Sequence, residues 1–234
     1  MHASDTCTSP PSTHSIFKSV DLTHVQYDSA DPLGPIIAYT TLIPIALLVS
    51  YTTQCVLSRD LASGFMFLGQ LVNEAINLVL KVSIKQARPT DHLGDGYGMP
   101  SSHAQFIWFF AVYASLYTTY RLNFRYTIWK PIIVSGLITS ATIVAYSRVR
   151  LQYHSIEQVA VGSALGVCVG FFWYIVVQYM LFPLADRLGI VEGWMGRLFL
   201  LRDTRKTGSL LVVQREWMGL FNHGAPAISK PKSE

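Results

Sequence analysis

Apolar residues are concentrated in five long stretches that are separated by short polar segments. These stretches lie near residues 35–57, 61–82, 104–120, 131–147 and 159–182. A helix needs about 20 apolar residues to cross the hydrocarbon core of a bilayer, with a range of about 17 to 25. Only Ser58, Arg59 and Asp60 separate the first two stretches, which predicts a tight helical hairpin. The pattern therefore predicts an all-α fold, a polytopic transmembrane helix bundle with about five spans.

The two ends of the chain differ from this central part. Residues 1–33 are rich in Ser, Thr, Asp, His and Pro, which is typical of a mobile polar tail. Residues 34–184 are the expected transmembrane catalytic domain, because they hold every apolar stretch and every candidate catalytic residue. Residues 185–234 mix apolar and basic side chains. This last segment is expected to be an interfacial helix on the cytosolic leaflet or, alternatively, a loosely packed tail.

Composition supports the membrane interpretation. Of the 234 residues, 50% are hydrophobic and only 14% are charged, whereas an ordinary soluble domain has about 25% charged residues. The formal net charge is +4, but the basic residues flank the apolar stretches and form no continuous soluble patch. A nucleic-acid partner is therefore not expected. The three cysteines are scattered, so neither a disulfide framework nor a zinc pattern is indicated.

One face of the second apolar stretch is polar. Its residues step by three and four, which places them on one side of a helix: Gln70, Asn73, Glu74, Asn77 and Lys81. A charge facing lipid would cost about 2.5 to 3.5 kcal/mol, so this face is expected to point into the bundle. Polar contacts between helices explain Gln70, Asn73 and Asn77. Lys81, at the end of the stretch, is expected to bind phosphate together with Arg88.

The fifth stretch carries small residues at every fourth position. Gly162, Gly166 and Gly170 continue the row that begins at His154 and Gln158. Small residues at this spacing let another helix approach closely. The row is interpreted as a packing feature without a chemical role of its own.

Three short segments beside the apolar stretches carry side chains that suit a phosphoryl group. They are Lys81-Val-Ser-Ile-Lys-Gln-Ala-Arg88-Pro89, Pro100-Ser-Ser-His103, and Ser147-Arg148 followed after five residues by His154. Cations and hydroxyls can hold the phosphoryl oxygens. Of the two histidines, one can attack phosphorus while the other donates a proton.

The spacings K-x6-R-P, P-S-x-H and S-R-x5-H resemble the three signature segments of the type 2 phosphatidic acid phosphatase superfamily. The individual residues of two segments look most like those of its dolichyldiphosphatase subfamily. They are Tyr97-Gly-Met-Pro-Ser-Ser-His103, and Ser147-Arg-Val-Arg-Leu-Gln-Tyr-His154 with Gln158. The resemblance covers residues 35 to 182. It implies a membrane phosphatase of the lipid bilayer whose substrate is a polyisoprenoid diphosphate lipid. The reaction would convert dolichyl diphosphate to dolichyl phosphate and inorganic phosphate.

The resemblance also implies a role for each site residue. His154 would attack phosphorus and form a phosphohistidine that water then hydrolyses, while His103 would protonate the departing oxygen. Lys81, Arg88 and Arg148 would hold the equatorial phosphate oxygens. The start of the third stretch would add the Ser101 hydroxyl and backbone N–H donors. No metal or other cofactor is expected.

Two positions depart from the superfamily's pattern. Ser102 replaces the glycine of P-S-G-H, and it would still supply its backbone N–H to the phosphate. Gln158 stands where the superfamily usually has Asp, four residues after the nucleophile. An amide oxygen there can fix the tautomer of His154, although it brings no charge. Glu157 is the alternative orienting group, because positions i+3 and i+4 of a helix both reach back to residue i.

The same residues allow other interpretations. Asp91, His92 and Asp95 could join His103 at a metal, but the spacing D-H-x-x-D matches no known metal pattern, and a polar loop accounts for it better. A broad-specificity lipid phosphate phosphatase is one rival function. A non-enzymatic lipid transporter or scramblase is another, disfavoured because both histidines are present. A soluble haloperoxidase with the same motifs is excluded by the five apolar stretches.

The order of the segments predicts the topology. With five spans, all three site segments emerge on one side of the membrane. The opposite side holds Arg59, the loop with Lys130 and the basic C-terminal tail. Positive residues mark the cytosolic side, so the site is expected to face the lumen of the endoplasmic reticulum, with the C-terminus cytosolic. The ending Lys230-Pro-Lys-Ser-Glu234 has the form of a dilysine retrieval address. The implied role is recycling of the lipid carrier used in protein N-glycosylation.

Overall fold

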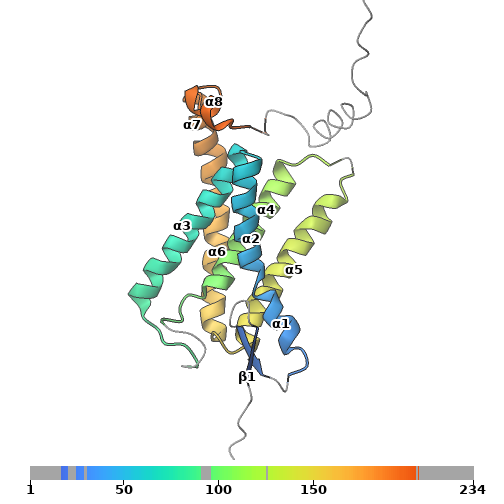
Figure 1. Ribbon diagram of the computed structural model, residues 1–234, viewed down its shortest axis with the longest axis vertical. Coiled ribbons are helices and arrows are strands. Elements are labelled where there is room, and N and C mark those ends of the chain that lie inside the picture. The colour runs from blue at the N-terminus through green and yellow to red at the C-terminus, as the bar shows by residue number, and fades with distance from the viewer. Residues whose placement is uncertain are drawn as a thin grey trace, which may run out of the picture.

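The computed structural model describes residues 17–20, 25–28, 31–90, 96–124, 126–203 and 205. Its strands are β1 (Phe17–Val20) and β2 (Val25–Asp28). Its helices are α1 (Gly34–Thr40), α2 (Ile43–Leu57), α3 (Leu61–Ile84), α4 (Ser102–Tyr120), α5 (Trp129–Arg150), α6 (Ile156–Val176), α7 (Phe182–Arg187) and α8 (Trp194–Phe199), and the π-helical turn η1 (Val177–Leu181) joins α6 to α7. The long helices run side by side between two ends of the molecule (Figure 1).

Within the described residues, four helical segments are long and apolar enough to cross a membrane. They are Gly34–Leu57, Leu61–Ile84, Trp129–Arg150 and Ile156–Arg187. The remaining predicted stretch, residues 104–120, forms α4, whose 19 residues lie in the middle of the bundle. Because its neighbours cover α4, its side chains meet protein more than lipid, and this position tolerates a polar residue such as Gln105. The predicted polytopic helix bundle is confirmed, with α4 as its buried centre.

The glycine row of α6 packs directly on the backbone of α4. A Cβ added at Gly162 would lie 2.6 Å from the carbonyl oxygen of Ser101, and one at Gly170 would lie 2.9 Å from that of Phe109. The carbonyl oxygen of Gln105 would meet a Cβ on Gly166 in the same way. The prediction that these small residues admit another helix is therefore confirmed. The contact fixes the start of α6 beside the start of α4.

The polar face of α3 points into the bundle, as predicted. Gln70, Asn73 and Asn77 are fully buried, whereas Leu78 and Val82 on other sides of the helix are exposed. Asp60 begins the helix, since its carboxylate accepts a hydrogen bond from the Ser63 backbone N–H at 3.1 Å. This orientation delivers Lys81, in the last turn of α3, to the same end of the molecule as the start of α4.

The N-terminal region differs from the expectation of a mobile tail, because β1 and β2 form an antiparallel hairpin. Val25 packs with Ala38 of α1 and with Leu151 and Tyr153, which connect α5 to α6. The Tyr153 hydroxyl accepts a hydrogen bond from the backbone N–H of Gln26 at 2.9 Å. Because residues 1–33 are mostly polar and each strand has only four residues, the composition did not indicate this hairpin. The hairpin lies at the lower end of the molecule in Figure 1.

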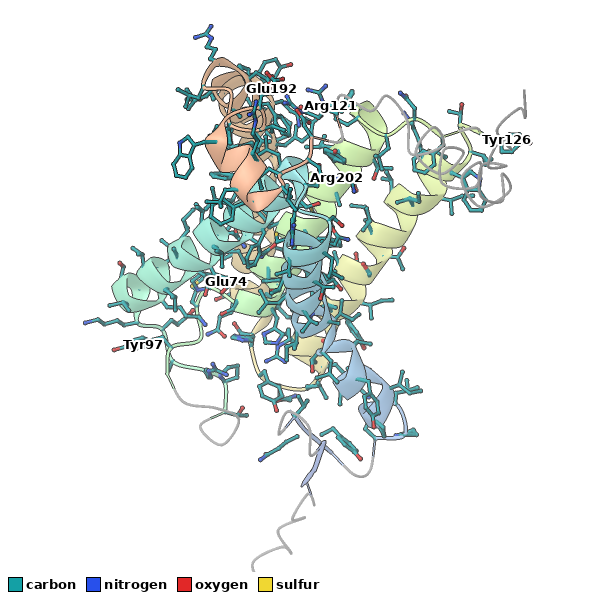
Figure 2. All side chains as sticks on the ribbon, turned by 45° about the horizontal axis from the view of Figure 1, so that its top comes forward. Glu74, Tyr97, Arg121, Tyr126, Glu192 and Arg202 are labelled. Carbon is teal, nitrogen blue, oxygen red and sulfur yellow. The ribbon has the colours of Figure 1, made fainter. Side chains whose placement is uncertain are left out.

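The described part of the C-terminal region returns to the opposite end. The Arg202 backbone N–H donates to the Arg59 carbonyl at 2.8 Å, and the Arg202 carbonyl accepts from the Leu61 N–H at 3.0 Å. The Arg205 guanidinium lies 3.8 Å above the Phe182 ring. Arg121, Glu192 and Arg202 mark this end in Figure 2, far from Tyr97. The predicted dilysine ending lies outside the described residues, and the cytosolic placement stays a prediction.

Candidate active site

The three predicted segments meet at one end of the bundle. Lys81 comes from the last turn of α3, and Arg88 from the connection between α3 and α4. The start of α4 contributes its N-cap Ser101, then Ser102 and His103. Arg148 comes from the last turn of α5, and His154 directly precedes the N-cap of α6. Residues distant in sequence therefore form one site, as their order along the chain predicts.

The turn between α5 and α6 fixes the spacing of Arg148 and His154. The Arg148 carbonyl accepts hydrogen bonds from the backbone N–H groups of Tyr153 at 3.1 Å and His154 at 3.2 Å. Gln152 adopts a left-handed conformation with φ 63°, which reverses the chain. Because both bonds end on one carbonyl, the five residues between Arg148 and His154 form a closed loop that holds both side chains at the same place.

Arg148 is buried and held by an aromatic ring. Its guanidinium carbon lies 4.3 Å from the centre of the Tyr153 ring. A ring face attracts a cation by about 0.5 to 2 kcal/mol. Within the described residues, its Nε atom and the Ser101 hydroxyl are buried without a hydrogen-bond partner. Buried donors of this kind suit an anion that supplies oxygens.

Gln158 fixes the tautomer of His154. Its amide nitrogen donates to the Ala87 carbonyl at 2.8 Å and lies 3.4 Å from the Gln86 side-chain oxygen. The amide oxygen therefore faces Nδ1 of His154, at 3.2 Å. An amide oxygen can only accept, so Nδ1 carries the proton and Nε2 keeps its lone pair. The arrangement leaves a nucleophilic nitrogen pointing away from Gln158.

Of the two candidates for the group that orients His154, Gln158 and Glu157, only Gln158 contacts its ring. Gln158 is buried against His154, whereas Glu157 is exposed. The Ser155 hydroxyl accepts from the Gln158 N–H at 3.3 Å, and the Gln158 amide oxygen accepts from the Ser155 N–H at 3.3 Å. This reciprocal capping box begins α6 at a fixed residue. The pattern Ser-x-x-Gln could have indicated it from the sequence.

His154 is neutral at physiological pH. Burial lowers the pKa of its imidazole to about 4, and the nearby cations Arg148 and Arg88 act in the same direction. The hydrogen bond to Gln158 opposes this shift. A neutral imidazole with a free Nε2 is the form that can attack phosphorus.

The remaining charged groups surround the two histidines. The His103 ring interacts electrostatically with Arg148, His154, Lys81 and Arg88. Three cations beside two imidazoles create a strongly positive site, and positive charge there stabilises the oxygens of a transferring phosphoryl group.

Next to Lys81 and Ser102 lie polar residues of α3 that the sequence analysis explains by packing between helices alone. Asn73 and Asn77 bond to Gln105 of α4, which confirms the predicted contacts between helices. Gln70 makes no such bond within the described part of the chain. The Ser102 hydroxyl contacts Lys81 and Asn77. Gln105 was missed, although a lone Gln inside an apolar stretch was a signal.

Gly98 has a steric role in the same site. A Cβ added at Gly98 would lie 2.6 Å from Nε2 of Gln158 and 2.7 Å from its Oε1. The backbone N–H of Gly98 donates to the Gln86 carbonyl at 2.7 Å. The connection between α3 and α4 therefore fits closely around the Gln158 amide. The alternative metal ligands Asp91, His92 and Asp95 lie outside the described residues.

Residues 63–181 match the sequence family described as the PAP2 superfamily. The chain belongs to this superfamily. A dolichyldiphosphatase 1 from Dictyostelium discoideum is 44% identical over 196 residues, which cover 82% of this chain and 85% of the relative. A dolichyldiphosphatase 1 from Homo sapiens is 37% identical over 215 residues, which cover 87% of each chain.

A solved structure is similar in fold. It is the crystal structure of a transmembrane PAP2 type phosphatidylglycerolphosphate phosphatase from Bacillus subtilis, with a TM-score of 0.54 and 20% identity. The similarity covers 65% of this chain and 80% of that chain. The resemblance drawn from the three sequence segments is confirmed at the level of superfamily and fold.

Proposed function

We propose that this membrane phosphatase hydrolyses dolichyl diphosphate to dolichyl phosphate and inorganic phosphate, without a metal and through a phosphohistidine. The observation that carries the proposal is the His154 ring, neutral and oriented by Gln158 through Nδ1, among three cations. The curated relatives reported above, which align with most of this chain, carry the name dolichyldiphosphatase.

The first step is transfer of the terminal phosphoryl group to the enzyme. Nε2 of His154 forms a bond to the terminal phosphorus while the bond from phosphorus to the bridging oxygen breaks. The electron pair stays on the bridging oxygen. His103, whose protonated form is favoured by the negative charge of the bound diphosphate, gives that oxygen a proton, and dolichyl phosphate leaves. Lys81, Arg88 and Arg148 hold the oxygens of the transferring group, with the Ser101 hydroxyl and the N–H groups at the start of α4 as further donors.

The second step returns the enzyme to its starting state. His103, now neutral, takes a proton from a water molecule that attacks the phosphohistidine. The bond between Nε2 and phosphorus breaks, inorganic phosphate leaves, and His154 regains its lone pair. Gln158 keeps Nδ1 protonated throughout, because its amide oxygen only accepts a hydrogen bond.

The site lies at one end of the bundle, which suits a phosphate attached to a lipid tail. We place this end on the lumenal face of the endoplasmic reticulum and the C-terminus in the cytosol, because Arg59, Arg121 and Arg202 lie at the opposite end, whereas phosphate binding explains the basic residues of the site. There the reaction would recycle the lipid carrier used in protein N-glycosylation.

The test is phosphate release by purified protein in detergent, from dolichyl diphosphate and from dolichyl monophosphate, each with EDTA. We expect EDTA-resistant release from the diphosphate and none from His154→Asn. Equal turnover of both lipids would instead identify a broad-specificity lipid phosphate phosphatase. No turnover by folded protein would favour a transporter or scramblase, and loss of activity with EDTA would contradict metal independence.

A further inference from the structure

A continuous chain of hydrogen bonds leads from the ammonium group of Lys81 into the core of the bundle. Lys81 Nζ donates to the Ser102 hydroxyl at 2.6 Å, and that hydroxyl donates to Oδ1 of Asn77 at 2.9 Å. Nδ2 of Asn77 donates to Oε1 of Gln105 at 2.7 Å. Nε2 of Gln105 then donates to Oδ1 and to the backbone carbonyl of Asn73, both at 2.9 Å. We call these five side chains the Lys81 relay.

The direction of every bond in the Lys81 relay is set by its charged end. An ammonium group only donates, so the Ser102 hydroxyl accepts from it and turns its own hydrogen to Asn77. Asn77 must then present its oxygen to Ser102 and its nitrogen to Gln105. Each oxygen therefore points toward the cation. Aligned bonds of this kind polarise one another and stabilise the positive charge at their end.

Burial makes this arrangement rigid. Asn73, Asn77 and Gln105 are fully buried between α3 and α4. A buried amide that loses its partner costs about 1 to 3 kcal/mol, so alternative rotamers of these three side chains are disfavoured. Because one hydrogen of the ammonium group is committed to Ser102, its other two remain available for oxygens in the site.

We infer that Asn77 and Gln105, acting through the Ser102 hydroxyl, position Lys81 to bind a phosphate oxygen. They are positioning residues, since they do not touch the reacting atoms. Ser102 is the position where this chain departs from P-S-G-H, and a glycine there would break the relay. The inference rests on the proposed function to the extent that Lys81 is a phosphate-binding group.

The experiment measures binding of radiolabelled inorganic phosphate to the purified full-length protein in detergent by equilibrium dialysis. Asn77→Leu and Ser102→Ala should each weaken binding about five- to tenfold, the loss of one hydrogen bond that preorganises the ammonium group. Ser102→Thr keeps a hydroxyl and should bind like the wild type. In hydrolysis of dolichyl diphosphate, the same substitutions should raise KM more than they lower kcat.

The matched control is Gln70→Leu. Gln70 is on the same face of α3 and equally buried, but it has no hydrogen-bond partner within the described part of the chain. It should leave phosphate binding unchanged. Equal weakening by Gln70→Leu and Asn77→Leu would overturn the inference, because burial alone would then explain the effect.

A Lys81→Met background separates positioning from general damage to the bundle. If Asn77 acts through Lys81, Asn77→Leu should cause no further loss of phosphate binding there. An undiminished loss in that background would overturn the inference. Should Asn77→Leu fail to fold, Ser102→Ala in both backgrounds gives the same comparison. Phosphate binding needs no turnover, so the relay is tested even if dolichyl diphosphate is not hydrolysed and the proposed function fails.

Discussion

Gly98 and Gln158 are fitted to one another: a Cβ on Gly98 would lie 2.6 Å from the Gln158 amide nitrogen. That amide bonds to His154 on one side and to the Ala87 carbonyl on the other. Gln158 thus joins His154, the proposed nucleophile, to the segment that carries Arg88. An Asp could hold His154 but could not donate to Ala87, which gives a physical reason for an amide at this position.

Gly98→Ala should therefore impair catalysis. The new methyl group displaces the Gln158 amide and releases His154 from its orientation. A misplacement of about 1 Å can cost about 100-fold in rate, so we expect kcat to fall about 10- to 100-fold. Steady-state hydrolysis of dolichyl diphosphate measures the kcat of this variant. The control is Gly64→Ala, since nothing lies within 4 Å of a Cβ there. Wild-type activity of Gly98→Ala would contradict this account of Gln158.

The acid limit of activity should respond to the residue at position 158. Burial and Arg148 hold the pKa of His154 at about 4, so its nucleophilic form persists well below pH 6.5. Gln158→Asp places a carboxylate beside Nδ1, which favours the protonated ring and raises this pKa. In the pH profile of kcat/KM, the fall on the acid side should then occur at a pH higher by about one unit or more. An unshifted limb would show that His154 does not set it.

Stability should also depend on the protonation of His154. Its pKa is lowered from 6.5 to about 4 on folding, so the unfolded state binds more protons between these values. Stability contributed by the neutral ring is therefore lost as pH falls from 6.5 toward 4. Thermal unfolding in detergent should show a falling Tm over this window. His154→Asn should show a smaller fall, and an identical fall would contradict the lowered pKa.

Much of the fold and site could be predicted from the sequence because the signals are local. Apolar runs of membrane length give the helices, and fixed spacings give Lys81, His103 and His154. The bond between Lys81 and Ser102 could not be predicted, because it depends on the register between α3 and α4. That register is set by packing between the two helices, including the bonds of Asn73 and Asn77 to Gln105. The N-terminal hairpin was missed because its strands have only four residues each.

The Tyr153 ring should matter for substrate binding through Arg148. Tyr153→Phe keeps the ring below the guanidinium and loses only the hydrogen bond from Gln26, so KM should change little. Tyr153→Leu removes a contact worth about 0.5 to 2 kcal/mol, and KM should rise about 2- to 30-fold. The measurement is the KM for dolichyl diphosphate of Tyr153→Phe and of Tyr153→Leu. Equal values would show that the ring face does not hold Arg148.

The packing of α6 on α4 should limit stability at Gly166. A methyl group there meets the Gln105 carbonyl oxygen and the Trp108 side chain, at 2.9 Å from Cβ of Trp108. Forcing a group into a packed contact costs about 1 to 3 kcal/mol, so Gly166→Ala should lower Tm. Gly136→Ala is the matched control, because a Cβ there has nothing within 4 Å. Alanine also favours a helix over glycine by about 1 kcal/mol, so this control should keep or raise Tm.

Gly166→Ala should also weaken phosphate binding, because Gln105 belongs to the Lys81 relay. A lower Tm with unchanged phosphate binding would show that the packing of α6 on α4 does not influence the relay.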